Sequence, residues 1–195
     1  MIAYFNGQFM EKDEIRISPD DRGFLFADGL YEVARSYSGH LFLLDDHIER
    51  LNYGARHLKL ARTDFSFLKA VAKELILKNG FADAEATVYI QVTRGAAKRI
   101  HAFPDPLPEL TVYAAASPFD ADKTAANMET GIAAITVPDT RWARCDMKTT
   151  GLTANILANE KAHASGASES IFIRDGVMLE GTHSNFMAVF DNVLV

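Results

Sequence analysis

Two neighbouring segments of the chain, residues 46–58 and 65–78, have the apolar spacing of amphipathic helices. In each, hydrophobic side chains recur every three or four residues, which is the period of an α-helix. These stripes consist of Ile48, Leu51, Ala55 and Leu58 in the first segment and Leu68, Val71, Ala72 and Leu75 in the second. Asp46, with Glu49 three residues later, predicts an acidic cap at the start of the first helix. Strand-like segments lie on both sides of the pair, so the sequence predicts a lobe of mixed α and β structure.

Two predicted β-hairpins precede these helices. Residues 2–10 are rich in apolar side chains and contain an Asn-Gly pair at 6–7, which favours a type I′ turn. Residues 31–37 and 40–44 flank a Ser-Gly pair, a second turn signal. Alternate side chains of a strand share one face and can line a pocket together. In the 31–37 strand these side chains are Tyr31, Val33, Arg35 and Tyr37.

The pattern divides the chain into two predicted lobes. Residues 1–117 form an N-terminal α/β lobe, which ends with strand-like segments rich in Thr, Val, Tyr and Ile. Residues 118–130 lack apolar periodicity and are the predicted interdomain linker. Residues 131–195 form a β-rich C-terminal lobe. Within it we predict strands at 131–137, 170–174, 177–180 and 185–190 and a helix at 153–164. Because a further strand only begins at 193–195, this lobe is predicted to be incomplete.

Composition excludes several classes of protein. The chain is 48% hydrophobic and 24% charged, and 26 acidic against 20 basic residues give a net charge of −6. With no run of basic residues, this charge argues against a nucleic-acid partner. The single cysteine, Cys145, can form no internal disulfide, and no ligand spacing predicts a metal site. The sequence shows neither a signal-peptide pattern nor a membrane-spanning run, so we predict a cytoplasmic protein with no membrane partner.

Lys148 is the candidate for covalent chemistry. It lies where a strand pattern gives way to a helix pattern, with Arg141 and Arg144 close to it in the sequence. Neighbouring cations lower the pKa of a lysine, which favours a Schiff base with a carbonyl cofactor. The alternative is an ordinary solvated lysine, one of nine in the chain.

Glu180 and Arg50 can complement such a lysine. Glu180 lies at the end of a predicted strand, and a carboxylate beside a pyridine nitrogen keeps that nitrogen protonated. Arg50, on the polar side of the first helix, has a planar fork of donors that suits phosphate. The alternatives are a glutamate in a turn and a solvated helix arginine. Arg99 and His101 can together bind a carboxylate, or can simply belong to a polar loop.

Four segments, in this order along the chain, resemble the motifs of the class IV, or fold type IV, pyridoxal phosphate enzymes. They are residues 21–33 (DRGFLFADGLYEV), 46–51 (DHIERL), 141–148 (RWARCDMK) and 180–185 (EGTHSN). Within this family, the Arg-x-His pattern of Arg99 and His101 resembles that of the D-amino acid aminotransferases. The resemblance implies a two-lobed α+β fold, with a smaller N-terminal α/β lobe and a C-terminal lobe that continues beyond Val195 in other members.

The resemblance also implies a role for each candidate residue. Lys148 would hold pyridoxal 5'-phosphate as a Schiff base and act as the catalytic base, Glu180 would pair with the pyridine nitrogen, and Arg50 would bind the phosphate. Tyr31 would line the substrate pocket. Arg99 and His101 would bind the substrate carboxylate across the interface of a homodimer. The implied reaction transfers nitrogen from a D-amino acid to a 2-oxo acid.

Two departures and two alternatives accompany this resemblance. Arg35 replaces the lysine that D-amino acid aminotransferases often carry in the pocket wall, and the chain stops before segments that complete the phosphate site in other members. We therefore expect the 195-residue chain to bind the cofactor weakly. The alternatives are a branched-chain aminotransferase or an aminodeoxychorismate lyase of the same family, and a shortened member without activity that serves as a binding module.

Overall fold

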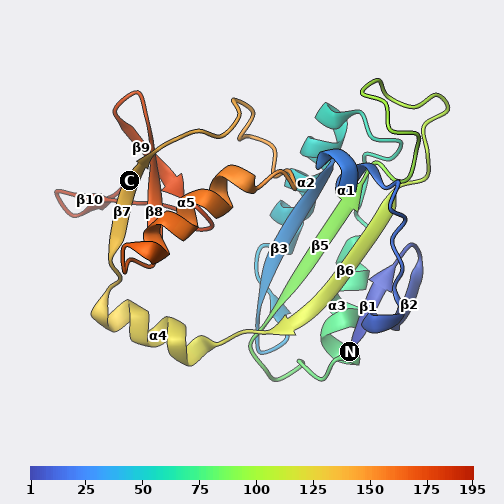
Figure 1. Cartoon of the computed structure of the whole chain (residues 1–195). Helices are drawn as coiled ribbons and strands as arrows, with labels where there is room; N and C mark the ends of the chain where they lie inside the picture. Colours follow the sequence, from blue (N-terminus) through green and yellow to red (C-terminus); the bar gives the residue numbers. More distant parts are fainter. The chain divides into compact units, whose positions relative to one another are not determined.

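The computed structural model describes all residues, 1–195, and they fall into two units (Figure 1). The first unit comprises Met1–Ala121 together with Asp146–Gly151. The second comprises Asp122–Cys145 and Leu152–Val195. This division differs from the predicted lobes, because a short segment from the C-terminal half of the chain belongs to the first unit. Main-chain hydrogen bonds to the start of the strand at residues 29–37 hold that segment there.

The first unit contains a six-stranded antiparallel sheet with the strand order β2-β1-β6-β5-β3-β4. The strands are β1 (Ile2–Phe5), β2 (Gln8–Glu11), β3 (Gly29–Tyr37), β4 (His40–Leu41), β5 (Ala86–Thr93) and β6 (Thr111–Pro118). Both predicted hairpins are present as β1-β2 and β3-β4. Along β3, Leu30, Glu32, Ala34 and Ser36 are buried, so the opposite face carries Tyr31 and Val33 as the alternation predicts.

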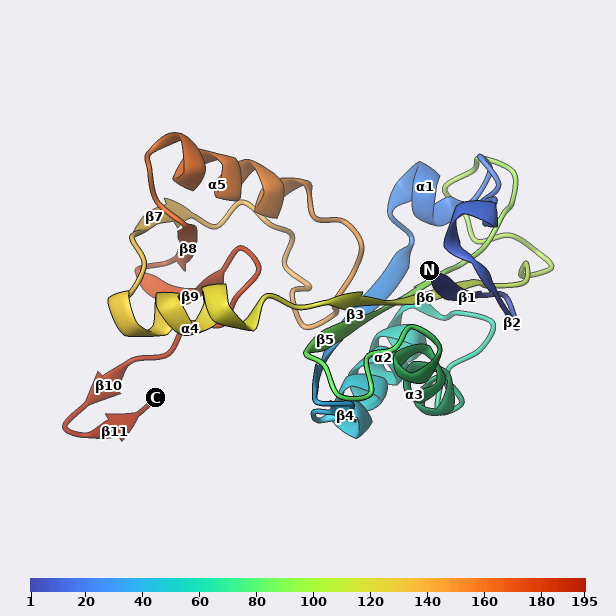
Figure 2. The same ribbon diagram turned by 90° about the horizontal axis from the view of Figure 1, so that it is seen from below.

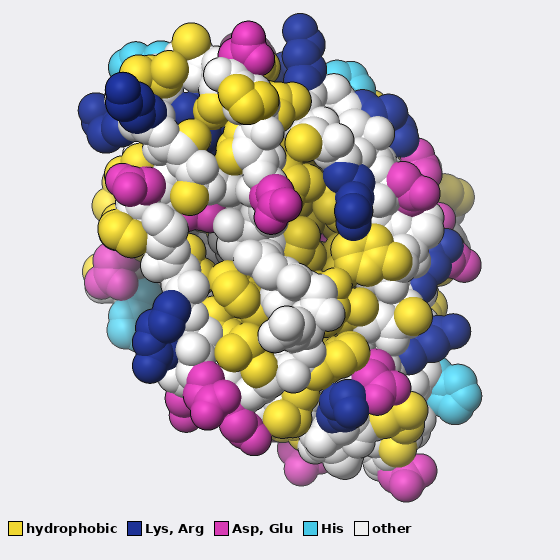
Figure 3. Space-filling view, turned by 90° about the vertical axis from the view of Figure 1, so that its right-hand side faces the viewer, with side chains coloured by type: hydrophobic (Ala, Val, Ile, Leu, Met, Phe, Trp, Pro, Cys, Tyr) yellow, Lys and Arg dark blue, Asp and Glu magenta, His cyan; other side chains and the backbone are white.

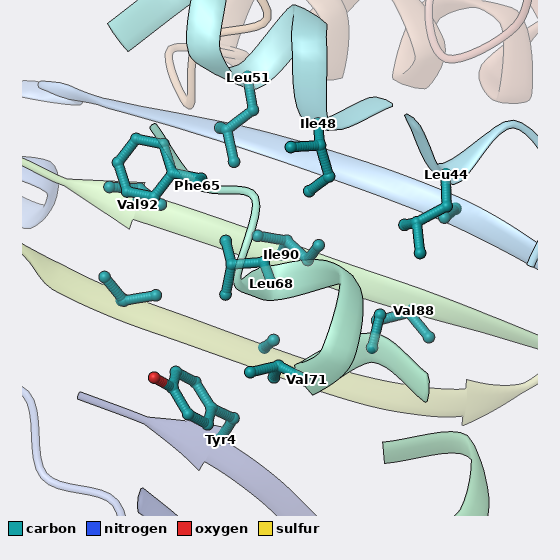
Figure 4. Close-up of a cluster of buried hydrophobic side chains, with 14 of the residues drawn as sticks. Tyr4, Leu44, Ile48, Leu51, Phe65, Leu68, Val71, Val88, Ile90 and Val92 are labelled. Atoms are coloured by element: carbon teal, nitrogen blue, oxygen red, sulfur yellow. The ribbon is translucent and has the colours of Figure 1, made fainter. Parts of the chain in front are cut away.

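Helices α2 (Leu44–Leu58) and α3 (Leu68–Lys78) pack on the same side of this sheet (Figure 2). Residues of both predicted stripes lie in the core. In α2, the predicted Ile48 and Leu51, together with Leu44 before them, point toward Val88, Ile90 and Val92 of β5 (Figure 4). Short segments flank these elements, namely the 3₁₀ turn η1 (Lys12–Glu14) and the helix α1 (Arg22–Phe26).

The start of α2 differs from the predicted acidic cap at Asp46. The N-cap is Leu43, which has a left-handed backbone (φ 49°) and makes no side-chain capping bond. Asp45 and Asp46 instead lie within the first turn, where their charges interact favourably with the positive end of the helix. Strand β4 ends at Leu41 and the turn of Phe42 and Leu43 leads directly into α2, so the hairpin and not a polar side chain sets where the helix begins.

The second unit contains a three-stranded sheet with the order β7-β8-β9. Its elements are α4 (Ala121–Thr130), β7 (Ala134–Pro138), α5 (Thr153–Ala164), β8 (Glu169–Arg174), β9 (Val177–Gly181), β10 (Val189–Phe190) and β11 (Val193–Leu194). Strands β7 and β8 are parallel, and α5 connects and covers them around Phe172. Helix α4 occupies most of the predicted linker because its Ala, Lys, Met and Glu residues favour helix even without an apolar stripe.

The surface carries charges of both signs. On the face shown in Figure 3, lysines and arginines are scattered among acidic side chains and do not gather into one patch. Apolar side chains lie between them on the same face. No helix in the structure combines the length and the hydrophobicity needed to cross a membrane.

Candidate active site

Lys148 lies in the segment of residues 146–151, which runs beside the start of β3. The Tyr31 amide donates a hydrogen bond to the Lys148 carbonyl (3.0 Å), and the Thr150 amide donates to the Gly29 carbonyl (3.1 Å). Next to the lysine, Met147 is buried in the core of the first unit. The segment is thus fixed on both sides of the lysine, which gives its side chain a defined origin.

The Lys148 amine lies over an aromatic ring. Its Nζ atom is 4.5 Å from the centroid of the Tyr31 ring, and the residue is half-buried. Tyr31 in turn stacks on Tyr89, with ring centroids 5.8 Å apart. Burial and the neighbouring phenols raise the pKa of Tyr89 to about 12, so the Tyr89 phenol stays uncharged at neutral pH. The structure therefore brings together two of the predicted residues, the lysine and the pocket tyrosine.

Arg50 is held by a carboxylate that the sequence analysis did not single out. Its Nε and Nη2 atoms donate to the two oxygens of Glu32 (2.5 and 2.6 Å), and His47 Nδ1 lies 2.8 Å from Glu32 Oε2. Burial opposes ionisation of Glu32, but the hydrogen bonds from Arg50 and His47 dominate and hold the pKa of Glu32 below its usual range. A signal existed in the sequence, because the alternation in β3 places Glu32 on the buried face, where a carboxylate needs a partner.

Arg99 and His101 lie in the loop between β5 and β6 and meet at one aromatic residue. The Arg99 guanidinium carbon is 5.3 Å from the centroid of the Phe26 ring, and the His101 ring centroid is 5.6 Å from it. Both residues are exposed. Both side chains therefore contact the same ring and are accessible from solvent.

Glu180 lies at the end of β9 in the second unit and pairs with an arginine. Arg141 donates through Nη1 to Glu180 Oε1, and its Nε and Nη2 donate to the two oxygens of Asp139, whose side chain is buried (both 3.0 Å). Burial disfavours the charge on Arg141, but the hydrogen bonds to Asp139 and Glu180 outweigh it and raise the pKa of Arg141. These side chains line a cavity of about 460 Å³ together with Cys145, Arg174 and Asn185.

The turn after Glu180 is organised by a second glutamate. Glu169 Oε1 accepts hydrogen bonds from the amides of Ser170 (2.8 Å) and Thr182 (3.0 Å) and from the Thr182 hydroxyl (2.5 Å), and Oε2 accepts from Ser184. Burial opposes its ionisation, but these bonds lower the pKa of Glu169 to about 2. A Cβ added at Gly181 would lie 2.2 Å from the Ser184 hydroxyl and 2.8 Å from Glu169 Oε2, so a larger residue there would displace these hydrogen-bonded groups.

The chemistry of these donors fits pyridoxal phosphate. The first unit carries an amine that can bind an aldehyde and a guanidinium whose orientation is set by Glu32, which suits a phosphate. The second carries Glu180 at the wall of a cavity, where a carboxylate can pair with a ring nitrogen. None of the predicted site residues is locked in the core without access to solvent.

Comparison with known proteins identifies the family. The family model for class IV aminotransferases matches residues 29–195. The chain is 41% identical over 199 residues to a D-alanine aminotransferase of Bacillus licheniformis, an alignment that covers 100% of the chain and 67% of the relative. It is 37% identical to a D-alanine aminotransferase of Staphylococcus haemolyticus, covering 98% of the chain and again 67% of the relative. The chain thus spans about two thirds of the length of these relatives.

A solved structure shows the same fold. The branched-chain amino acid aminotransferase of Escherichia coli superposes with a TM-score of 0.87 at 21% identity, over 99% of this chain and 66% of that one. The match confirms the predicted α+β fold of type IV, and the sequence matches confirm the predicted resemblance. The chain therefore belongs to the class IV aminotransferases.

Proposed function

We propose that this protein transfers an amino group from a D-amino acid to a 2-oxo acid, with Lys148 as the catalytic residue. The observation that carries the proposal is the half-buried Lys148 amine, fixed beside β3 over the Tyr31 ring. The identity to D-alanine aminotransferases from two genera supports the choice of D-amino acids as donors. The coarser statement, an aminotransferase dependent on pyridoxal phosphate that acts on amino acids and 2-oxo acids, follows from the family.

The proposed roles follow from the chemistry of each side chain. Pyridoxal phosphate supplies an electron sink for the carbanion at the substrate Cα. Lys148 Nζ would hold the cofactor through its aldehyde. Once the substrate amine has displaced it from the aldehyde carbon, the free Nζ amine would accept the proton from the substrate Cα and donate it at the cofactor C4′. Arg50, oriented by Glu32, binds the phosphate, and Glu180, oriented by Arg141, receives the hydrogen bond of the ring nitrogen.

The other three predicted residues are proposed to bind the substrate. Tyr31 forms a wall of the substrate pocket beside the Lys148 amine. Arg99 and His101 bind the substrate α-carboxylate, and which substituent of Cα then faces Lys148 decides the preference for the D enantiomer. We further propose a homodimer in which this pair acts on the site of the partner subunit. A cytoplasmic location remains a prediction, which cell fractionation would test.

Borohydride reduction of the cofactor-loaded protein tests the role of Lys148. Reduction fixes the cofactor on the lysine that carries it, and peptide mapping by mass spectrometry then identifies that lysine. We expect the adduct on the peptide that contains Lys148 and none after Lys148→Ala, with Lys161→Ala on α5 as the matched control. An adduct on Lys161 or on another lysine would show that the assignment is wrong.

A panel of amino donors tests the substrate class. We expect turnover of D-alanine and D-glutamate with a 2-oxo acid acceptor, and little turnover of their L enantiomers. Equal or faster turnover of L-valine and L-leucine would move the protein to the branched-chain group. The absence of any cofactor adduct and of any turnover would favour the alternative of a binding module.

A further inference from the structure

Three groups surround the ring of Phe26, the last residue of α1. The guanidinium carbons of Arg22 and Arg99 lie 4.8 and 5.3 Å from its centroid, and the His101 ring lies 5.6 Å away at an angle of 49°. Phe26 is thus in contact with both members of the pair that we propose for carboxylate binding. Nothing in the proposed chemistry uses Phe26 itself.

Arg22 binds the main chain between the same two residues. Its Nη1 atom donates a hydrogen bond to the carbonyl of Ile100 (2.6 Å), and its Nε donates to Asp28 (2.9 Å). Arg22 is only 3% exposed. A buried arginine without such partners would be very costly, so these bonds fix the position of the Ile100 peptide.

Arg22 is supported by a second buried arginine, Arg94, and by the Asp28 carboxylate that both arginines bind. Arg94, which is 1% exposed, shares Asp28 with Arg22 and binds it through two nitrogens (2.7 and 3.0 Å). Arg94 also donates to the carbonyls of Leu58 and Lys59 at the end of α2. Burial opposes ionisation of Asp28, but the hydrogen bonds from Arg94 and Arg22 hold its pKa below the usual range. The loop that carries Arg99 is therefore tied to the core of the first unit.

The ends of the loop are also closely packed. The Arg22 amide donates to the Gly95 carbonyl (2.9 Å), and the Ala97 amide donates to the Asp20 carbonyl (3.1 Å). Gly95 has a φ of +88°, and an added Cβ would lie 1.9 Å from the Glu109 carbonyl. Within the loop, the Ile100 amide donates to the Lys98 carbonyl (2.8 Å), and from outside the loop Arg22 and Phe26 contact residues 99–101.

We propose that Arg22 and Phe26 are positioning residues for substrate binding: Arg22 fixes the peptide between Arg99 and His101, and Phe26 sets the orientation of their side chains. This inference rests on the proposed role of that pair in binding the α-carboxylate. Without Arg22 and Phe26, the exposed loop would become ordered only when the substrate binds. The free-energy cost of that ordering would lower the affinity for the substrate. The chemistry at Lys148 would be changed less, because neither residue touches the reacting atoms.

Phe26→Leu tests the inference with Phe24→Leu as its matched control. Both residues belong to α1 and undergo the same change, but Phe24 is 77% exposed and makes none of these ring contacts. We expect Phe26→Leu to raise the KM for D-alanine about tenfold with kcat within about threefold of the parent, since a misplaced binding group weakens binding before it affects chemistry. Phe24→Leu should leave both constants unchanged.

Two further measurements distinguish failure of the positioning inference from failure of the proposed carboxylate-binding role. The ring of Phe26 should shift the NMR signal of the His101 Cε1 proton, and Phe26→Leu should abolish that shift whatever the function of the loop. Arg22→Ala should raise KM like Phe26→Leu, and Arg22→Lys should restore part of the loss because it keeps one donor.

The pattern of KM values then decides between the proposals. If Arg99→Ala raises KM but Phe26→Leu does not, the positioning inference is wrong and the carboxylate role stands. If Arg99→Ala leaves KM unchanged, the carboxylate role fails and the inference falls with it. A His101 Cε1 proton signal that keeps its parent position in Phe26→Leu would overturn the inference on geometry alone.

Discussion

At the residue scale, buried carboxylates explain how the candidate site residues are held. Glu32 orients Arg50, Asp28 joins Arg22 to Arg94, and Glu169 organises the turn after Glu180. Each of these acids is ionised because it receives several hydrogen bonds, which repay the cost of burial. Carboxylates that face the interior therefore set the positions of groups near the proposed cofactor and substrate sites.

Glu169 provides a test of this principle through pH. Its folded pKa of about 2 lies below the usual 4.5, so its contribution to stability is present above pH 4.5 and is lost as the pH falls toward 2. A shift of this size corresponds to about 3 kcal/mol of unfolding free energy. Urea unfolding of the parent between pH 5 and about pH 2.5 should show most of that loss. Glu169→Gln should be less stable at neutral pH and should show a flatter pH dependence; parallel curves for the two proteins would contradict the assignment.

The sequence singles out candidate site residues, whose roles stay predictions, but it does not identify the partners that hold them. Lys148, Glu180 and Arg50 stand out by type and motif, whereas Glu32 and Glu169 act through contacts that depend on the folded chain. The sequence did not indicate the role proposed for Phe26, because an apolar residue in a short segment has no distinctive pattern. Its role depends on residues more than 70 positions away, which the topology alone brings near.

At the element scale, predictions were best where a local pattern determines the structure. Helix α5 spans the predicted residues 153–164, and strands β8 and β9 each lie within one residue of the predicted segments 170–174 and 177–180. Helix α1 was not predicted, since its five residues are too few to show a period and its cap, Asp21, relies on distant hydroxyls at Thr93 and Thr111. The predicted strand at 185–190 is reduced to the two residues of β10.

Asn79 shows how an element boundary can also join two elements. The sequence marks it only as the end of α3, but its Oδ1 accepts from the Ile2 amide and its Nδ2 donates to the Ile2 carbonyl (both 2.9 Å). Asn79→Ala removes both bonds between α3 and β1, and we expect a loss of about 1–3 kcal/mol in unfolding free energy, as measured by urea denaturation. Asn127→Ala, on the exposed surface of α4, is the matched control and should change stability by less than about 0.5 kcal/mol. Equal effects of the two substitutions would argue against the tether.

At the scale of the whole molecule, the proposed dimer makes a prediction about mixed subunits. If Arg99 acts on the partner subunit's site, then a subunit with Lys148→Ala still offers its own Arg99, and a subunit with Arg99→Ala still offers its own Lys148. Each mixed dimer then contains one complete site. Because random exchange makes half of the dimers mixed, an equal mixture of the inactive Lys148→Ala and the weakly binding Arg99→Ala variants should recover about a quarter of the parent kcat/KM for D-alanine.

The same experiment shows whether Arg99 acts on the site of the partner subunit or on the site of its own chain. Recovery should appear only after the variants are mixed and allowed to exchange subunits, and its rise can be followed by D-alanine turnover over time. A mixture of Lys148→Ala with Glu180→Ala is the control, because both residues are proposed to act within one subunit and each mixed dimer would then lack a complete site. If the Arg99 mixture recovers no more activity than this control, Arg99 acts within its own chain. A homodimer would then no longer be needed to complete the carboxylate site.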